Sequence, residues 1–279
     1  MNSNSSSPAD APQSCRRIDV LTVAAIGVLA YFVAGLVHEG SHALTGVAFG
    51  IHKLKLTSFD VEFDHRLLTD LQRRMVSAAG ILCNLLTGSL LLFLVRKPRR
   101  SANLRYFIWL LSHISLFVGG GYMMALSFVS FGDVNNLLRG LPHELALRVG
   151  TTVLGALVMT FTLIHGAYWL NPFLGLDANA RSKRALKLSI VPYLAGCFVD
   201  TSAAVFAGAG VFLVVCSAAA ASFGGTSWML MMVFPIDGGR RFASDPPLTP
   251  ARSGLWIALG VAAATLNFGV FGQGVHVAF

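Results

Sequence analysis

Six apolar stretches constrain this chain more than any other feature of its sequence. They lie at 18–50, 74–95, 104–131, 145–170, 187–222 and 254–275. Each is close to or longer than the ~20 residues that an α-helix needs to cross a bilayer. The chain is 54% hydrophobic and only 12% charged, whereas soluble domains carry about 25% charged residues. The sequence therefore predicts an all-α polytopic membrane protein and excludes a soluble domain of useful size.

Two regions leave the number and type of elements open. The fifth stretch is long and rich in Gly and Ala, and together with WMLMMVF (228–234) it can form two spans. We therefore expect six or seven transmembrane helices. Between the first two spans, the alternating LKLTSFDVEF in 52–70 favours a small β-hairpin or strand segment. Residues 1–17 are polar and predict a disordered N-terminal tail.

The basic residues indicate topology rather than a nucleic-acid partner. Net charge is +8, but the cations lie in short loops, which is typical of membrane topology and contact with the lipid bilayer. With the N-terminus inside, Arg16, Arg17 and the clusters at 96–105 and 181–187 give 11 cytoplasmic cations, against seven on the other side. The positive-inside rule therefore favours an N-terminus inside, and we expect no nucleic-acid binding.

The first span contains AGLVHEGSHALTG (34–46), which places ionisable groups where they are costly and usually functional. His38 and His42 are four residues apart, so on a helix they share one face. Two imidazoles at that spacing can hold one Zn²⁺. The adjacent Glu39 can then act as general base on a metal-bound water, as in HExxH zinc hydrolases. The motif predicts a zinc site inside the membrane.

A catalytic zinc needs a third protein ligand, and several residues could supply it. HEGSH lies in the second half of the first span, so the end of the third span, where Asp133 follows, returns to the same depth. Asp237 in FPIDGGRRF is the alternative. We interpret His113 and His165 as interior histidines, because they lie elsewhere along their spans. Asp200 is interpreted as a polar contact between helices.

HEGSH followed by AAGILCN (78–84) resembles the site-2 protease family of intramembrane zinc metalloproteases. The second motif of that family is AGPxxN. Ala79, Gly80 and Asn84 match its spacing, and Ile81 replaces its proline. A later aspartate, often in LDG, completes the zinc site of the family. PIDGGR (235–240) matches that wording better, whereas Asp133 in FGDVNN fits the expected order better.

The resemblance implies a catalytic three-helix core at 18–138, followed by C-terminal transmembrane helices at 139–279. Zinc would be bound by His38, His42 and Asp133, with Asp237 as the alternative third ligand. Glu39 would transfer the proton. Asn84 would donate a hydrogen bond to the substrate backbone or the oxyanion, or else join helices. The substrate would be a transmembrane protein. The expected location is a bacterial plasma membrane, with the chain as a multi-pass protein.

Two other classes of function compete with a protease. One is a membrane zinc hydrolase that cleaves something other than protein. The other is a non-enzyme, either a catalytically inactive zinc protein that binds or scaffolds, or a transporter. An intact Glu39 argues against a degenerate site, since a purely structural zinc does not need it. A transporter would show matched repeats or broken helices, and the sequence has no such symmetry.

Overall fold

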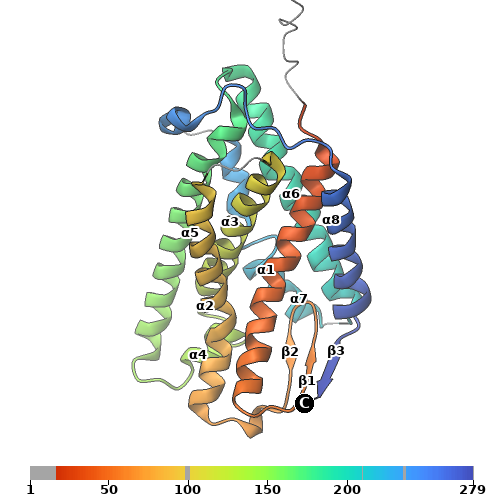
Figure 1. Cartoon of the computed structure of the whole chain (residues 1–279). Coiled ribbons are helices and arrows are strands. Elements are labelled where there is room, and N and C mark those ends of the chain that lie inside the picture. The colour runs from red at the N-terminus through yellow and green to blue at the C-terminus, as the bar shows by residue number, and fades with distance from the viewer. Residues whose placement is uncertain (1–16, 98–100, 209, 235–236, 279) are drawn as a thin grey trace, which may run out of the picture.

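Six long apolar helices build the molecule, as the computed structural model shows (Figure 1). The structure describes residues 17–97, 101–208, 210–234 and 237–278, without the side chains of 65, 237 and 238. The six helices are α1 (Val20–Ala48), α2 (Asp70–Val95), α3 (Ala102–Ala125), α5 (Glu144–Leu174), α6 (Ala178–Phe206) and Gly254–Phe271, which joins α8 (Gly254–Leu266) to η4 (Asn267–Phe271). The predicted all-α polytopic membrane fold is confirmed.

The segment that allowed a seventh span instead contains two short helices. These are α7 (Val211–Ala220) and the 3-10 helix η2 (Ser227–Val233). At 1.5 Å per residue, the ten residues of α7 reach about 15 Å, half the thickness of a bilayer core. Both elements fold back against the bundle, and a Cβ atom on Gly121 of α3 would collide with the Ala220 carbonyl. The described chain therefore has six candidate spans.

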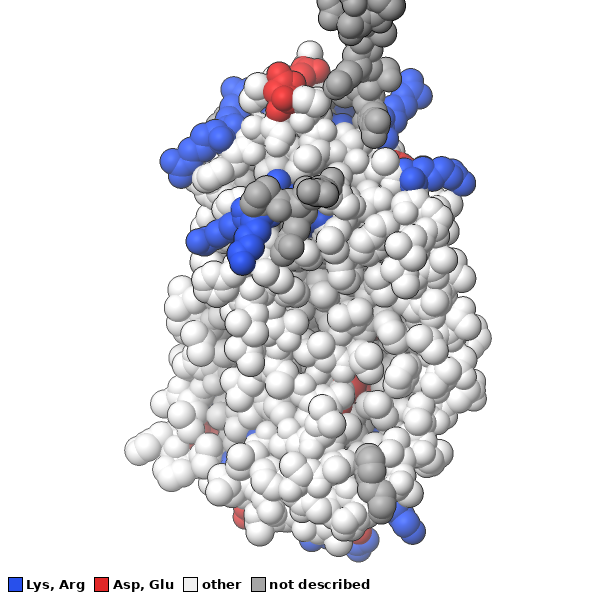
Figure 2. Space-filling model, in the orientation of Figure 1, with Lys and Arg blue, Asp and Glu red and all other residues white. Residues whose placement is uncertain are grey.

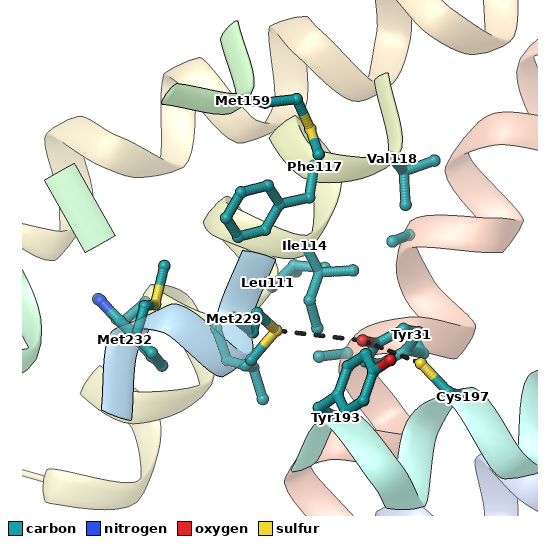
Figure 3. Close-up of a cluster of buried hydrophobic side chains, with 14 of the residues drawn as sticks. Tyr31, Leu111, Ile114, Phe117, Val118, Met159, Tyr193, Cys197, Met229 and Met232 are labelled. Atoms are coloured by element: carbon teal, nitrogen blue, oxygen red, sulfur yellow. Dashed lines mark hydrogen bonds between the residues drawn. The ribbon is translucent and has the colours of Figure 1, made fainter. Parts of the chain in front are cut away.

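Helix α3 lies at the centre of the bundle. In its most apolar window 89% of the residues are buried, against 17% for α5. Its side chains face α1, α5, α6 and η2 across one apolar cluster, part of which Figure 3 shows. Glycines permit the close packing: a Cβ atom on Gly155 of α5 would lie 2.8 Å from the Gly120 carbonyl oxygen. Small residues commonly bring membrane helices together in this way.

A three-stranded sheet covers one end of the bundle, beside the end of α1 (Figure 1). Its strands are β1 (Lys53–Leu56), β2 (Val61–Glu62) and β3 (Val275–Ala278), in the order β2-β1-β3. Both pairings are antiparallel, and Lys55 pairs with Glu62 on one side and His276 on the other. The predicted hairpin is confirmed. The third strand comes from the far end of the chain, which the local pattern did not indicate.

Helix boundaries near the site differ from the apolar stretches. The third stretch runs to residue 131, but α3 ends at Ala125, and a turn leads to the short helix α4 (Asp133–Leu138). The fifth stretch begins at 187, but α6 begins nine residues earlier, at Ala178. Arg181 and Arg184 lie buried in its first turns and donate to the carbonyls of Gly175 and Phe173. The part of the sequence that carries these two arginines thus belongs to α6 and not to a loop before it.

Candidate metal centre

The three side chains that could share a metal ion converge between α1 and α4. His38 and His42 are both buried, and their ring centroids lie 4.9 Å apart. Asp133 places Oδ2 3.1 Å from His38 Nε2 and 3.3 Å from His42 Nε2. One ligand atom from each residue lies within 4.8 Å of the others. The structure therefore joins a pair on one helix to a carboxylate more than 90 residues away.

The separations suit a shared ion. Zinc bonds to imidazole nitrogen and carboxylate oxygen are about 2.0–2.2 Å, so tetrahedral geometry places neighbouring ligand atoms about 3.3–3.5 Å apart. The two contacts of Asp133 fall close to that range. Two nitrogen ligands and one oxygen ligand are a set that several divalent metals accept. The group fits a divalent cation.

Short-range geometry presents Asp133 to the histidines. Gly132 precedes Asp133 and has φ 82°, a backbone conformation that residues other than glycine rarely adopt. Two arginines then hold α4 in place. Arg74 of α2 donates to the carbonyls of Leu137 and Arg139. Arg148 of α5 donates to Asn135 Oδ1 at 2.9 Å and to the Ser127 carbonyl. Sequence reasoning missed both arginines, because nothing in the sequence marks these carbonyls or the Asn135 amide as their partners.

A hydrogen bond from Nδ1 of His42 determines the tautomer of the ring. His42 Nδ1 lies 2.7 Å from the Val76 carbonyl oxygen, so Nδ1–H donates there. The lone pair of the neutral ring is then on Nε2, the atom that faces Asp133. Metal-binding histidines usually donate their other N–H to such a carbonyl. His42 is thus held in the tautomer that binds a metal through Nε2.

Asn84 plays the equivalent part for His38. It is fully buried, and its Nδ2 lies 3.2 Å from His38 Nδ1. Its Oδ1 is buried without a hydrogen-bond partner among the described residues. A half turn of the amide about Cβ–Cγ brings Oδ1 to His38 instead, so that Nδ1–H donates to it. Nε2 of His38 then carries the lone pair, as in His42. The unpartnered oxygen is therefore explained if His38 binds a metal.

Gly80 lets α2 approach both histidines. A Cβ atom at this position would lie 2.5 Å from His42 Nε2 and 2.8 Å from His38 Nε2. No real Cβ atom makes such contacts, so a side chain here would displace the nitrogen atoms that face Asp133. The match of AAGILCN to the second family motif thus falls on residues that touch the histidines. Asn84 lies behind His38 rather than at the cavity described next.

Glu39 faces a cavity of about 460 Å³ beside the group. His42, Asp133 and Phe59–Phe63 also contribute to its wall. Glu39 is itself buried, and it borders two much smaller cavities that Asp200 also lines. Tyr122 stacks on the His38 ring at 4.4 Å. A carboxylate outside the ligand group, next to it and facing open space, is suited to proton transfer.

Two aspartates outside the spans differ in their pKa. Burial raises the pKa of Asp60, in the β1–β2 turn. Burial also disfavours the charged form of Asp133, but positive charge on protonated imidazoles of His42 and His38 outweighs burial and holds the pKa of Asp133 below its ordinary value. Positive charge beside Asp133 therefore favours its ionised form, and a bound cation would supply that charge in place of the imidazole protons.

The other candidates lie elsewhere. His113 and His165 contact each other, Nε2 to Nδ1, at 3.1 Å. Asp200 lines the small cavities beside Glu39. The side chain of Asp237 lies outside the described part of the structure. Its backbone begins η3 (Asp237–Phe242), where Gly239 packs on Asn171, near the end of α5 farthest from α4.

No protein-family model, curated protein or solved structure matches this chain.

Proposed function

We propose that this protein is an intramembrane zinc metalloprotease similar to the site-2 protease family. It would hydrolyse peptide bonds in or near transmembrane segments of membrane-protein substrates. One observation carries the proposal: the HExxH histidines and Asp133 converge within 4.8 Å beside a cavity that Glu39 faces. A bacterial plasma membrane stays the expected location.

The ligand set favours zinc. Catalytic zinc sites commonly use three protein ligands of nitrogen and oxygen type and leave one position open. His38, His42 and Asp133 would hold the ion and leave the side toward the cavity free. Zinc bound there would act as a Lewis acid on a carbonyl group and activate water at neutral pH.

Glu39 would move the proton. It follows His38 directly, so α1 fixes its position relative to the ligands. Its carboxylate faces the cavity and has no hydrogen bond among the described contacts, so it is free to accept a proton from water and deliver it to the leaving amine. Tyr122 stacks on the His38 ring and would shield that face of the ligand from solvent. Asn84 would act on the reaction through His38, by holding its tautomer, rather than by touching the substrate.

The sheet offers a place for an unwound substrate. Amide bonds in a transmembrane helix are protected by the hydrogen bonds of the helix, so the segment must unwind before cleavage. β3 occupies one side of β1 and β2 the other, which leaves β2 as the edge next to the cavity. An extended chain that pairs with β2 would recover backbone hydrogen bonds. The same pairing would bring its peptide bonds toward Glu39.

The test measures zinc content and cleavage of single-span reporter proteins. We expect Glu39→Gln to keep the metal and lower the cleavage rate by about 10²–10⁴, the usual contribution of a general acid–base group. Asp70→Asn serves as the control, because Asp70 is an exposed carboxylate at the start of α2. Full activity in Glu39→Gln eliminates the protease. Zinc binding without any cleavage in the wild type supports the non-proteolytic alternatives.

A further inference from the structure

The cations of this protein are divided unequally between the two ends of the bundle. The first five spans alternate in direction and α8 runs the same way as α6, so α1, α3, α6 and α8 begin at the end where α2 and α5 finish (Figure 1). Backbone contacts tie that end together: Asp19 N–H donates to the Pro250 carbonyl, and Leu248 N–H to the Pro172 carbonyl. We call it the basic end, and the opposite end, with the sheet and α4, the cleft end.

Eleven described Lys and Arg residues lie at the basic end. Six of them lie on connections or near the ends of other helices: Arg17, Arg96, Lys97, Arg105, Arg240 and Arg241. Two more, Lys183 and Lys187, lie on the exposed side of α6. Arg252 precedes α8, and Arg181 and Arg184 are the buried pair of α6. Figure 2 shows Lys and Arg side chains gathered at this end, above a belt without charge. Four aspartates accompany them, namely Asp19, Asp177, Asp237 and Asp245.

The cleft end has fewer cations than the basic end, and its carboxylates are nearly as numerous as its own cations. Of the 21 Lys and Arg residues in the chain, seven lie there: Lys53, Lys55, Arg66, Arg73, Arg74, Arg139 and Arg148. Four of them form ion pairs with nearby carboxylates: Lys55 with Glu62, Arg66 with Asp64, Arg73 with Asp70, and Arg148 with Glu144. Four of the seven cations at this end are therefore paired with a carboxylate, whereas the eleven described cations of the basic end outnumber the aspartates beside them.

Two independent effects then orient the molecule. Short loops rich in Lys and Arg remain on the cytoplasmic side of a membrane. An excess of cations near the surface is attracted to the anionic lipids of the cytoplasmic leaflet. Both effects favour the basic end in the cytoplasm. We infer that the basic end contacts the anionic cytoplasmic leaflet, and that the metal centre opens toward the opposite, non-cytoplasmic side.

The depth of the metal centre makes this orientation matter. His42 lies six residues before the end of α1 at Ala48, which is about 9 Å along the helix axis. It lies 22 residues after Val20, about 33 Å from the basic end. The cavity wall also includes Asn136 and Arg139 of the cleft end. Resting on the proposed function, the inference is that substrates are cut near the non-cytoplasmic ends of their spans.

Cysteine labelling tests the orientation without reference to catalysis. The four native cysteines are replaced by serine or alanine, and one cysteine is added at a neutral exposed position. Leu67→Cys marks the cleft end, where Leu67 is 66% exposed. Ser182→Cys marks the basic end, where Ser182 is exposed on α6. Intact cells are treated with a membrane-impermeant maleimide, and a second sample is permeabilised first. Zinc content confirms that each variant is folded.

We expect Leu67→Cys to react at least about tenfold faster than Ser182→Cys in intact cells, since the reagent reaches one side alone. Permeabilisation should make both react. Labelling of Ser182→Cys alone in intact cells overturns the inference, and so does equal labelling of the two. If a substitution prevents folding, Arg66→Cys and Lys183→Cys replace the pair with adjacent positions.

A second measurement keeps this inference separate from the proposed function. Two single-span reporters carry the same helix-destabilising segment, one at the cytoplasmic end of the span and one at the other end. We expect cleavage of the second at least about tenfold faster, because the ligands lie about 9 Å from the non-cytoplasmic end. Correct labelling with neither reporter cleaved leaves the orientation standing and rejects the protease. Preferential cleavage at the cytoplasmic end rejects the inference and keeps the protease.

Discussion

Two pairs of histidines lie inside the helix bundle, and their surroundings differ. His38 and His42 come from one turn of α1, and both place Nε2 within 3.3 Å of the Asp133 carboxylate. A cavity of about 460 Å³ adjoins them, and a second carboxylate, Glu39, faces that cavity. This half of the molecule therefore brings together a group that could hold a metal ion, a cavity and an adjacent carboxylate, which the proposed hydrolytic centre would require.

The second pair joins α3 to α5 instead. His113 Nδ1 lies 2.5 Å from the Trp109 carbonyl oxygen, and Nε2 lies 3.1 Å from His165 Nδ1. Aromatic rings of Trp109, Phe161 and Trp169 surround the pair. Among the described His, Cys, Asp and Glu side chains, a group that could hold a metal ion forms at the first pair, and none includes His113 or His165. In this protein, the convergence of a carboxylate distinguishes the first pair of histidines from the second.

The largest expected effect separates the pairs by metal content. Asp133→Ala removes the shared carboxylate and leaves two imidazoles on one helix, fewer than the three protein ligands of a usual zinc site. We expect the zinc content of the purified protein to fall from about one ion per chain to nearly none. Elemental analysis after dialysis measures it. His113→Ala is the control and should keep the wild-type content; retained zinc in Asp133→Ala refutes the ligand set.

The next effect comes from Gly80. An added methyl group in Gly80→Ala would lie 2.5 Å from His42 Nε2 and 2.8 Å from His38 Nε2. Overpacking of this kind costs about 1–3 kcal/mol, and here it falls on the ligands, so we expect zinc affinity to drop about a hundredfold. Competition with a zinc chelator measures the affinity. Gly40→Ala is matched to it, since that position has open space within 4 Å; equal losses in both variants would contradict the close approach.

Local sequence pattern was sufficient for the parts of the site that lie within one helix. The four-residue spacing of His38 and His42 depends on helix geometry alone. Depth along consecutive spans also favoured Asp133, because alternating helices return to the same side. The all-α membrane fold followed from apolar length, which is likewise a local property.

Long-range packing decided what the sequence could not show. Arg74 holds the end of α4 through backbone carbonyls, which leave no mark in a sequence, and Arg148 holds α4 through the side-chain amide of Asn135. β3 joins β1 from more than 200 residues away. The Gly/Ala-rich fifth stretch carried no signal that distinguishes a full span from α6 followed by the short α7. In each of these cases the local structure depends on contacts with residues far away in the sequence, which the local pattern does not contain.

A smaller effect should follow from Asn84. Asn84→Ala leaves His38 Nδ1 without its partner, so the ring is no longer held with Nε2 toward Asp133. Loss of such outer contacts lowers metal affinity by about 10–100-fold, and we expect about tenfold. Asn84→Asp should recover most of the affinity, because its carboxylate can accept from Nδ1–H. Chelator competition distinguishes the two variants; a loss of the same size in Asn84→Asp would show that Asn84 does not act through this hydrogen bond.

The smallest effect tests the second pair by itself. His165→Phe keeps an aromatic ring between Phe161 and Trp169 and removes a buried Nε2 atom that has no partner among the described residues. It also leaves His113 Nε2 without a partner, so one unpaired nitrogen replaces another. Since the two costs are alike, we expect the free energy of unfolding to change by less than about 1 kcal/mol, and zinc content to stay at the wild-type value. Denaturant titration in detergent measures the first and elemental analysis the second. The same substitution in the other pair, His42→Phe, should remove the metal; zinc loss in His165→Phe would make the two pairs equivalent and would end the distinction drawn between them.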